Sequence, residues 1–505
     1  MGFFGSKKQT PPPHPRREPR LEGPLTAERA AEIFAGCADF DRRTIFLGGD
    51  PAKPVQLLWI GGQVRTERVC DYVLRPLVQS GELCRAGADE AFELAEKGVV
   101  YCLGTQRRDT MDQVALDLVG GWAALFFPGR AQALTFMVST EEKRSVGEAE
   151  NEPDIKGARD SFTESLRTNT SLVRRRLRAP ELRLAEEIVG RQTLTPVDVV
   201  WLEGIADEDL ARRVRAQLRE IDIDALLTAG SLEQYLADTH RTAFPLTVYT
   251  ERPDRFCAAL CEGRVGVLAD GLPMGWLFPA TLDCFFRTGQ DSSSGWLIAS
   301  VLTVLRYLCV LLTLFLPGLY TAAVLFHPEL IPTRLMLSII AARADVPFPT
   351  LLEVLVMLLA FEVLQEAGVR LPASIGQTIS ILGGLVVGTA AVEAKLVSPA
   401  VLVAVAIAGV AGYTAPSQDL AAAVRIWRFG LTVAAGVLGL MGLVLGGVLL
   451  VHHLAGLESF GTAYLTPFSS NAGRQREGHT VLRQPLPSVK TRPDYLNTEN
   501  RRNQG

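Results

Sequence analysis

The strongest constraint on this chain is an abrupt change in polarity near residue 295. From Gly295 to Ser470 there are seven Lys/Arg and eight Asp/Glu in 176 residues, about 9% charged, against 21% for the whole chain. In water this stretch would expose far more apolar surface than soluble monomers do, whereas lipid accepts such a composition. We therefore expect a soluble α/β region over residues 1–290 and an α-helical transmembrane bundle over residues 295–456.

The two ends of the chain indicate its orientation. Residues 1–36 carry basic residues but no apolar core of a signal peptide, so we expect a disordered segment on the cytoplasmic side. Residues 457–505 form a polar C-terminal tail. Its last part, 471–505, has seven Lys/Arg against three Asp/Glu, and we expect it to be disordered and cytoplasmic.

Composition and motifs argue against several classes of function. The net charge of −4 gives no indication of nucleic-acid binding. None of the eight cysteines forms a CxxC, and Cys257 and Cys261 are better interpreted as ordinary thiols in a reducing compartment than as metal ligands. No GxGxxG or GxxxxGKS/T follows a strand-like run, and no nucleophile–base arrangement is visible. We expect no cofactor, no metal and no enzymatic activity.

The soluble region contains an internal repeat. PVQLLWIGG at 54–62 aligns with PVDVVWLEG at 196–204, and GWAALFFPG at 121–129 aligns with GRVGVLADG at 263–271. Both matches have an offset of 142 residues. Two ungapped matches at one offset predict duplicated lobes.

Each lobe is expected to be α/β, with a strand, a glycine turn, a helix and two further short strands. We assign lobe 1 to residues 37–140 and lobe 2 to residues 191–290. The expected helices cover Thr66–Val78 in lobe 1 and Glu208–Ile221 in lobe 2.

Residues 141–190 connect the lobes and are expected to be helical. Ser161 and Glu164 have capping-box spacing at the start of one helix, and a second charged helix is expected at Glu181–Val189. Their basic side chains could form a clamp on acidic lipid or on a neighbouring subunit, while a solvated inter-lobe helix pair is the alternative. These candidate residues are Arg159, Asp160, Glu164, Arg167, Asn169, Arg174, Arg175 and Arg176.

Five segments of the apolar half are candidate membrane spans. If both termini are cytoplasmic, the number of full spans is even, so four spans with Thr350–Leu364 as a re-entrant segment would fit. The segments are Leu297–Phe326, Thr350–Leu364, Ile375–Val392, Val397–Tyr413 and Phe429–Val451.

Polar residues gather on and after the segment Thr350–Leu364. Ionisable groups in lipid cost roughly 2.5–3.5 kcal/mol each on insertion scales, so they face a partner or water. A hydrated path is one interpretation of this group. The other is that the glutamates lie at the membrane ends or pair with Arg343 or Arg370. The candidate pore or gate residues are Glu353, Glu362, Gln365, Glu366 and Gln377.

A collinear set of motifs resembles the GerA family, the A subunits of bacterial spore germinant receptors. The resemblance covers about residues 37–470. The motifs include KGARDSFTESLRTNT at 156–170, FHPELIPT at 326–333, VPFP at 346–349, FEVLQEAGVRLP at 361–372 and LVSPA at 396–400.

The resemblance implies a multi-pass protein of the spore inner membrane, with its soluble region and tail facing the spore core. It implies a transporter-like B subunit and a lipoprotein C subunit as partners, and a homo-oligomeric ring, expected to be pentameric, that acts as a nutrient-gated ion channel. It also implies an inter-lobe or inter-subunit role for the connector residues and a pore or gate role for the glutamate-bearing segment. A non-conducting scaffold of the receptor cluster and a solute transporter are the alternatives. A transporter would be expected to repeat its interrupted helices, and only the soluble region shows a repeat.

The chain departs from the family pattern after Arg287. An acidic, tyrosine-rich stretch is usual there, and this chain has QDSSSG at 290–295. Contacts at the start of the first membrane segment are therefore expected to differ. This leaves open whether the chain is a receptor subunit or a stage V sporulation paralogue.

Overall fold

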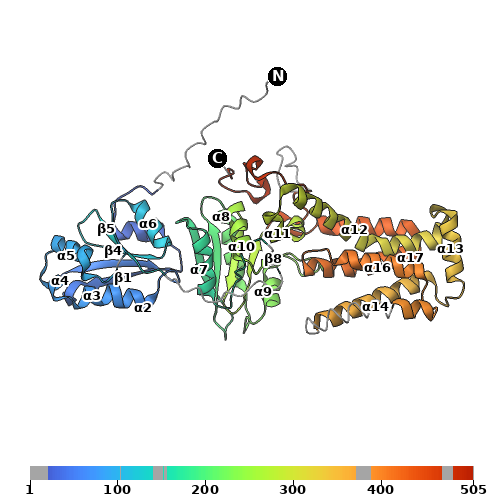
Figure 1. The fold of residues 1–505 in the computed structure, drawn as a ribbon, viewed down its shortest axis with the longest axis horizontal. Coiled ribbons are helices and arrows are strands. Elements are labelled where there is room, and N and C mark those ends of the chain that lie inside the picture. The colour runs from blue at the N-terminus through green and yellow to red at the C-terminus, as the bar shows by residue number, and fades with distance from the viewer. Residues whose placement is uncertain are drawn as a thin grey trace, which may run out of the picture.

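The structure is a computed structural model that describes residues 21–102, 104–139, 152, 156–370, 388–468 and 481–503. Two α/β lobes and a group of long helices follow one another along the longest axis of the molecule (Figure 1). Lobe 1 lies at one end, lobe 2 lies in the middle, and the helical half forms the other end.

Each lobe contains a five-stranded antiparallel sheet. The strand order is β1-β2-β4-β5-β3 in lobe 1 and β6-β7-β9-β10-β8 in lobe 2. β1 and β6 begin 142 residues apart, so the topology repeats with the sequence offset, as a duplication predicts. The strands are β1 (Phe40–Phe46), β2 (Pro54–Ile60), β3 (Thr105–Arg108), β4 (Trp122–Phe126), β5 (Ala133–Met137), β6 (Leu182–Val189), β7 (Thr195–Leu202), β8 (Val248–Thr250), β9 (Val265–Ala269) and β10 (Gly275–Phe278).

Helices cover both faces of each sheet. Those of lobe 1 are α1 (Ala27–Ile33), η1 (Leu47–Gly49), α2 (Thr66–Arg68), η2 (Val69–Leu74), α3 (Arg75–Gln79), α4 (Gly81–Arg85), α5 (Ala88–Leu94), η3 (Ala95–Val99) and α6 (Met111–Val119). Those of lobe 2 are α7 (Leu166–Arg176), α8 (Glu208–Glu220), α9 (Ala229–Leu236), α10 (Pro253–Glu262) and η4 (Leu282–Phe286).

Alternation along the central strands explains why both faces are covered. In β2, Val55 and Leu57 belong to a core with η2, α3 and α5, whereas Leu58 and Ile60 belong to a core with α1 and α6. Strand β7 repeats this arrangement, with α8 and α9 on one face and α7 and α10 on the other.

The helical half contains two helices long and apolar enough to cross a membrane, α12 and α17, by length and composition among the described residues. The chain reverses direction within α17 at Gly439, where φ is 63°, so that the rings of Trp427 and His453 on its two arms lie 5.6 Å apart. The expected segment Ile375–Val392 falls mostly on residues 375–387, which lie outside the described residues. The elements are α11 (Gly289–Ser293), α12 (Trp296–Phe326), η5 (Pro328–Leu330), α13 (Thr333–Arg343), α14 (Thr350–Arg370), α16 (Pro399–Gly412), α17 (Gln418–Ala455), β11 (Glu458–Ser459) and β12 (Thr462–Ala463), followed by η6 (Leu486–Ser488) and η7 (Asp494–Leu496) in the tail.

Two expectations for the connector are wrong. Residues 181–189 are not a helix, because Leu182–Val189 pairs along its whole length with β7 as the edge strand β6. In this strand Leu182 and Leu184 are buried in the core that contains α7, whereas Ile188 is exposed. In addition, α7 begins at Leu166 and is capped by Ser165, rather than starting at Ser161.

Two segments expected to be disordered are partly ordered. Within residues 1–36, α1 is capped by Thr26 and buries Ala30 and Ile33 against lobe 1. In the tail, residues 481–503 pack on lobe 2 and bury Leu496 and Thr498. Both segments gain order from tertiary contacts that their polar composition does not indicate.

Candidate functional site

The two lobes are joined by a buried ion pair. Arg174 on α7 donates from Nε to Asp39 Oδ2 at 2.5 Å and from Nη2 to Asp39 Oδ1 at 2.7 Å. Both residues are at most 3% exposed. Burial alone would lower the pKa of Arg174, but the Asp39 carboxylate outweighs it and raises that pKa. Arg174 therefore contributes a fixed inter-lobe contact and does not face lipid.

A second inter-lobe contact lies beside this pair. Gln63 Nε2 donates to the backbone oxygen of Ser171 at 3.0 Å, and the Ala38 amide donates to the carbonyl of Leu184 at 2.8 Å. Sequence patterns gave no signal for Asp39 or Gln63, because neither lies in a periodic or motif-like stretch.

The other connector candidates act mainly within lobe 2. Arg167 pairs with Glu186 at 2.7 Å, and Arg176 pairs with Asp160 at 2.5 Å. Asn169 closes the turn before α7, because its side chain bonds Thr163 through both backbone groups. Glu164 contributes its carbonyl to the Gly271 amide. Arg159 and Arg175 also have polar partners.

Glu353 is fully buried where α13, α14 and the start of α16 meet. It accepts from Arg343 Nε at 3.2 Å and from the Ser398 amide at 2.9 Å. This is the internal pairing with Arg343 that the sequence left open. Arg343 thereby balances the charge of the buried Glu353 carboxylate between these helices.

Glu362 lies between two arginines of α17. It pairs with Arg425 at 3.2 Å and with Nη2 of Arg428, which is almost fully buried. Arg425 also donates to Gln365 Oε1 at 2.8 Å. We call Glu362, Gln365, Arg425 and Arg428 the α14–α17 network.

The network contains one carboxylate and two guanidinium groups. Sequence reasoning missed Arg425 and Arg428, although two arginines at i and i+3 entering a long apolar helix were a visible signal. Glu366 is exposed and has a polar partner. Gln377 and the side chain of Arg370 lie outside the described residues.

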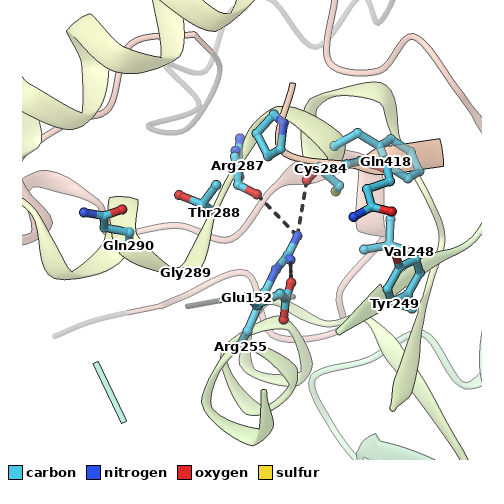
Figure 2. A pocket seen from close by; sticks show the side chains of 13 residues that line it. Glu152, Val248, Tyr249, Arg255, Cys284, Arg287, Thr288, Gly289, Gln290 and Gln418 are labelled. Atoms are coloured by element: carbon cyan, nitrogen blue, oxygen red, sulfur yellow. Dashed lines mark hydrogen bonds and ion pairs between the residues drawn. The ribbon is translucent and has the colours of Figure 1, made fainter. Parts of the chain in front are cut away.

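Lobe 2 meets the helical half around a cavity of about 250 Å³ with polar and apolar lining residues (Figure 2). Arg255 of α10 pairs with Glu152 and donates to the carbonyls of Cys284 and Arg287, both at 3.4 Å. Gln418, the first residue of α17, lies on the opposite wall beside Tyr249. Burial, together with the acidic groups around it, raises the pKa of Tyr249 to about 12.

The residues that depart from the family pattern contact α12 directly. Asp291, in the QDSSSG stretch, accepts two hydrogen bonds from Arg306 of α12, at 2.5 and 3.0 Å. Arg306 also donates to the carbonyl of Phe286 at 3.0 Å. A bidentate carboxylate–arginine pair therefore joins α11 to α12, and the bond from Arg306 to Phe286 links this contact to the end of lobe 2.

Within the described ranges, no group of three or more His, Cys, Asp or Glu side chains is arranged to hold a metal ion. The polar contacts above join lobes and helices to one another. Ion pairs and hydrogen bonds therefore connect the soluble lobes to the helical half.

Comparison with known proteins assigns the family. Residues 28–495 match the family described as Bacillus/Clostridium GerA spore germination protein. The chain is 35% identical to spore germination protein KA of Bacillus subtilis over 97% of this chain and 90% of that protein. It is 32% identical to spore germination protein GerLA of Bacillus cereus, over 91% and 93% of the two chains. The chain belongs to the GerA family.

Two further likenesses complete the comparison. An uncharacterized membrane protein of B. subtilis, YfkQ, is 36% identical over 88% of this chain and 85% of its own length. The crystal structure of the N-terminal domain of the A subunit of the Bacillus megaterium spore germinant receptor GerK3 matches with a TM-score of 0.41 and 29% identity. That match covers 50% of this chain and 92% of the crystallised domain.

Proposed function

We propose that this chain is the A subunit of a spore germinant receptor and forms a nutrient-gated ion path through the spore inner membrane. Family membership supports the role in germination. The observation that carries the ion path is the α14–α17 network, a group of charges held between otherwise apolar helices.

The helical half has the dimensions and surface for a membrane. α12 has 31 residues, about 46 Å at 1.5 Å per residue, and a bilayer core is about 30 Å thick. α17 folds back at Gly439, so its two arms, 418–438 and 440–455, are about 31 and 24 Å long. Large apolar side chains on their outer surfaces, such as Leu311, Val437 and Val448, are more than half exposed. Water would not favour this surface, whereas lipid would.

In this proposal the paired charges of the α14–α17 network stabilise the closed state. Charged groups cost several kcal/mol in an apolar environment unless they are paired or hydrated. Moving α14 away from α17 would expose Glu362 and two guanidinium groups to water, which stabilises a hydrated open state. A nutrient can shift the assembly to the open state only if it binds the open state more strongly than the closed state.

The proposed assembly is a homo-oligomeric ring that works with a B subunit and a lipoprotein C subunit. Several copies of α14 around one axis would line a central path, whereas one copy would not. Both termini would face the spore core, which requires an even number of full spans. A non-conducting scaffold of the receptor cluster is the competing function.

Substitution of Glu362 tests whether the α14–α17 network stabilises the closed state. Glu362→Gln keeps the size of the side chain and removes its charge, so we expect spores to release K⁺ before nutrient broth is added, faster than wild type by tenfold or more. Glu329→Gln is the matched control, because Glu329 is exposed in the α12–α13 connection. Normal protein level and unchanged K⁺ release would remove Glu362 from gating.

Two measurements on purified protein separate the ion path from the scaffold. Light scattering corrected for detergent should give a multiple of the 54.8 kDa chain. Liposomes that contain the chain with its partner subunits should show conductance that Glu362→Gln changes. A particle that stays monomeric with its partners, or liposomes without conductance, would favour the scaffold.

A further inference from the structure

The C-terminal segment 481–503 contacts lobe 2 and the base of α12 at the same time. It runs over the outside of lobe 2 near the start of the helical half (Figure 1, red). Four of its side chains are 9% exposed or less, although the segment is polar in composition. They are Val489, Arg492, Leu496 and Thr498.

The segment is folded on itself. Thr491 and Arg502 form a β-bridge, and the amide of Arg492 donates to the carbonyl of Arg501 at 2.8 Å. The amide of Asn503 closes the loop by donating to the carbonyl of Lys490 at 2.8 Å. A closed loop of this kind presents a fixed surface to lobe 2.

Its far part is held by lobe 2 through three hydrogen bonds. Arg492 Nε donates to the carbonyl of Cys261 at 2.7 Å, and the Glu499 amide donates to the carbonyl of Ile205 at 3.2 Å. The buried Arg264 donates to the Tyr495 hydroxyl at 3.1 Å. Burial raises the pKa of that phenol, so it stays neutral as an acceptor.

Its near part is held by the helical half. The Arg483 amide donates to Ser300 Oγ in the second turn of α12, at 2.9 Å. The Arg483 guanidinium donates to the carbonyl of Asp291. Because the Asp291 side chain already binds Arg306, Arg483 joins the same contact between α11 and α12.

A buried polar chain connects the two attachment points inside the protein. Arg264, which holds Tyr495, lies 3.5 Å from Thr281 Oγ1, and this hydroxyl donates to Asp283 at 2.5 Å. Asp283 pairs in turn with Arg287 at 2.8 Å, just before α11. The side-chain contacts end at Arg287, and the next residue, Thr288, donates its amide to Asp291 at 2.8 Å.

We propose that residues 481–503 act as a strap that couples lobe 2 to α12, so that a displacement of lobe 2 reaches the first long helix. The strap adds to the covalent connection through residues 279–296 and to the packing of Phe286 of η4 on Tyr307 of α12, whose rings lie 3.8 Å apart. Releasing it should weaken the coupling between lobe 2 and α12. The consequence for ion release rests on the proposed function, whereas the coupling itself does not.

Hydrogen exchange on the full-length chain tests the coupling by perturbing one end and observing the other. Arg483→Ala removes the guanidinium contact at the helix base and should raise exchange at residues 259–264 and 490–503 by tenfold or more. Tyr495→Phe removes only the acceptor for Arg264 and should raise exchange at residues 296–303. Lys490→Ala, at an exposed side chain, is the control. Changes confined to the immediate neighbours of each substitution would overturn the strap.

A chain that ends at residue 480 tests the consequence in spores. We expect it to reduce K⁺ release after nutrient broth by tenfold or more at normal protein level. Deletion of the whole chain is the control, and under the proposed function it should abolish the response. If it does, but the truncated chain releases K⁺ as wild type does, the strap is overturned and the proposed function stands. If deleting the whole chain has no effect, the proposed function fails and the exchange result alone decides the strap.

Discussion

Arg174 and Asp39, 135 residues apart in the chain, form two hydrogen bonds of 2.5 and 2.7 Å at the centre of the lobe interface. The pair lies where water is excluded, so neither charge has an alternative partner in solvent. Such pairs contribute modestly when intact, yet removal of one partner leaves a buried charge uncompensated. The lobe interface should therefore depend strongly on both residues.

The first prediction concerns this pair. Asp39→Asn should destabilise the protein by about 3–5 kcal/mol, because it leaves the Arg174 guanidinium buried without a counter-charge. Chemical unfolding of the full-length protein in detergent measures the change. Asp209→Asn is the matched control, since its pair with Arg212 is exposed and should cost less than about 1 kcal/mol. Equal effects at both sites would contradict the role given to the lobe interface.

The second prediction concerns pH. Asp198 of β7 is fully buried, and neither carboxylate oxygen has a hydrogen-bond partner among the described residues. Burial raises its pKa from 3.8 to about 7; Glu186 and Asp39 add to the rise, while Arg167 and Arg174 oppose it. The folded state therefore binds more protons than the unfolded state between about pH 4 and 7, so stability falls as pH rises through that window.

Asp198→Asn should remove this dependence. It keeps the shape of the side chain and cannot ionise, so it should stabilise the protein above pH 7, by up to about 4 kcal/mol at 1.36 kcal/mol per pKa unit. Unfolding midpoints from pH 5 to 8 measure the slope. Asp222→Asn, at an exposed position, should leave the slope as in wild type. A steep slope retained in Asp198→Asn would assign the dependence to another group.

The third prediction concerns the α14–α17 network. Glu362→Gln and Arg428→Gln should each destabilise the protein, and the double substitution should cost less than the sum of the two. A coupling energy of about 0.5–3 kcal/mol is typical of side chains in direct contact. Thermal unfolding in detergent of the four members of the cycle measures it. Additive effects would mean that the two residues do not interact.

The fourth prediction concerns the contact between lobe 2 and the tail. Gly263 ends α10 with φ of 106°, and a Cβ there would overlap Thr498. Gly271 has a similar φ of 81°, but a Cβ there meets open space. Gly263→Ala should thus cost more than Gly271→Ala, which carries only the left-handed strain of about 1–2 kcal/mol. Protease cleavage within 481–503 should also accelerate only in Gly263→Ala.

Local patterns in the sequence determined much of the architecture. The offset of 142 residues predicted two lobes, and the strand order repeats with that offset. The expected helix Glu208–Ile221 corresponds to α8, and the expected segment Leu297–Phe326 falls within α12. These features depend on residues close in the chain, whose hydrophobic period is visible without the fold. The expected single segment Phe429–Val451 is wrong, because the chain reverses at Gly439 in its middle.

Tertiary structure decided which charges meet. Glu362 was a candidate from the sequence, but its partners Arg425 and Arg428 lie more than 60 residues away on another helix. Strand β6 looked helical because its charges obscured the alternation, and pairing with β7 decided its conformation. The tail looked disordered because its composition is polar, and hydrogen bonds to lobe 2 and α12 hold it in place. Composition and period describe a segment alone, whereas burial and ion pairing depend on what the completed fold brings beside it.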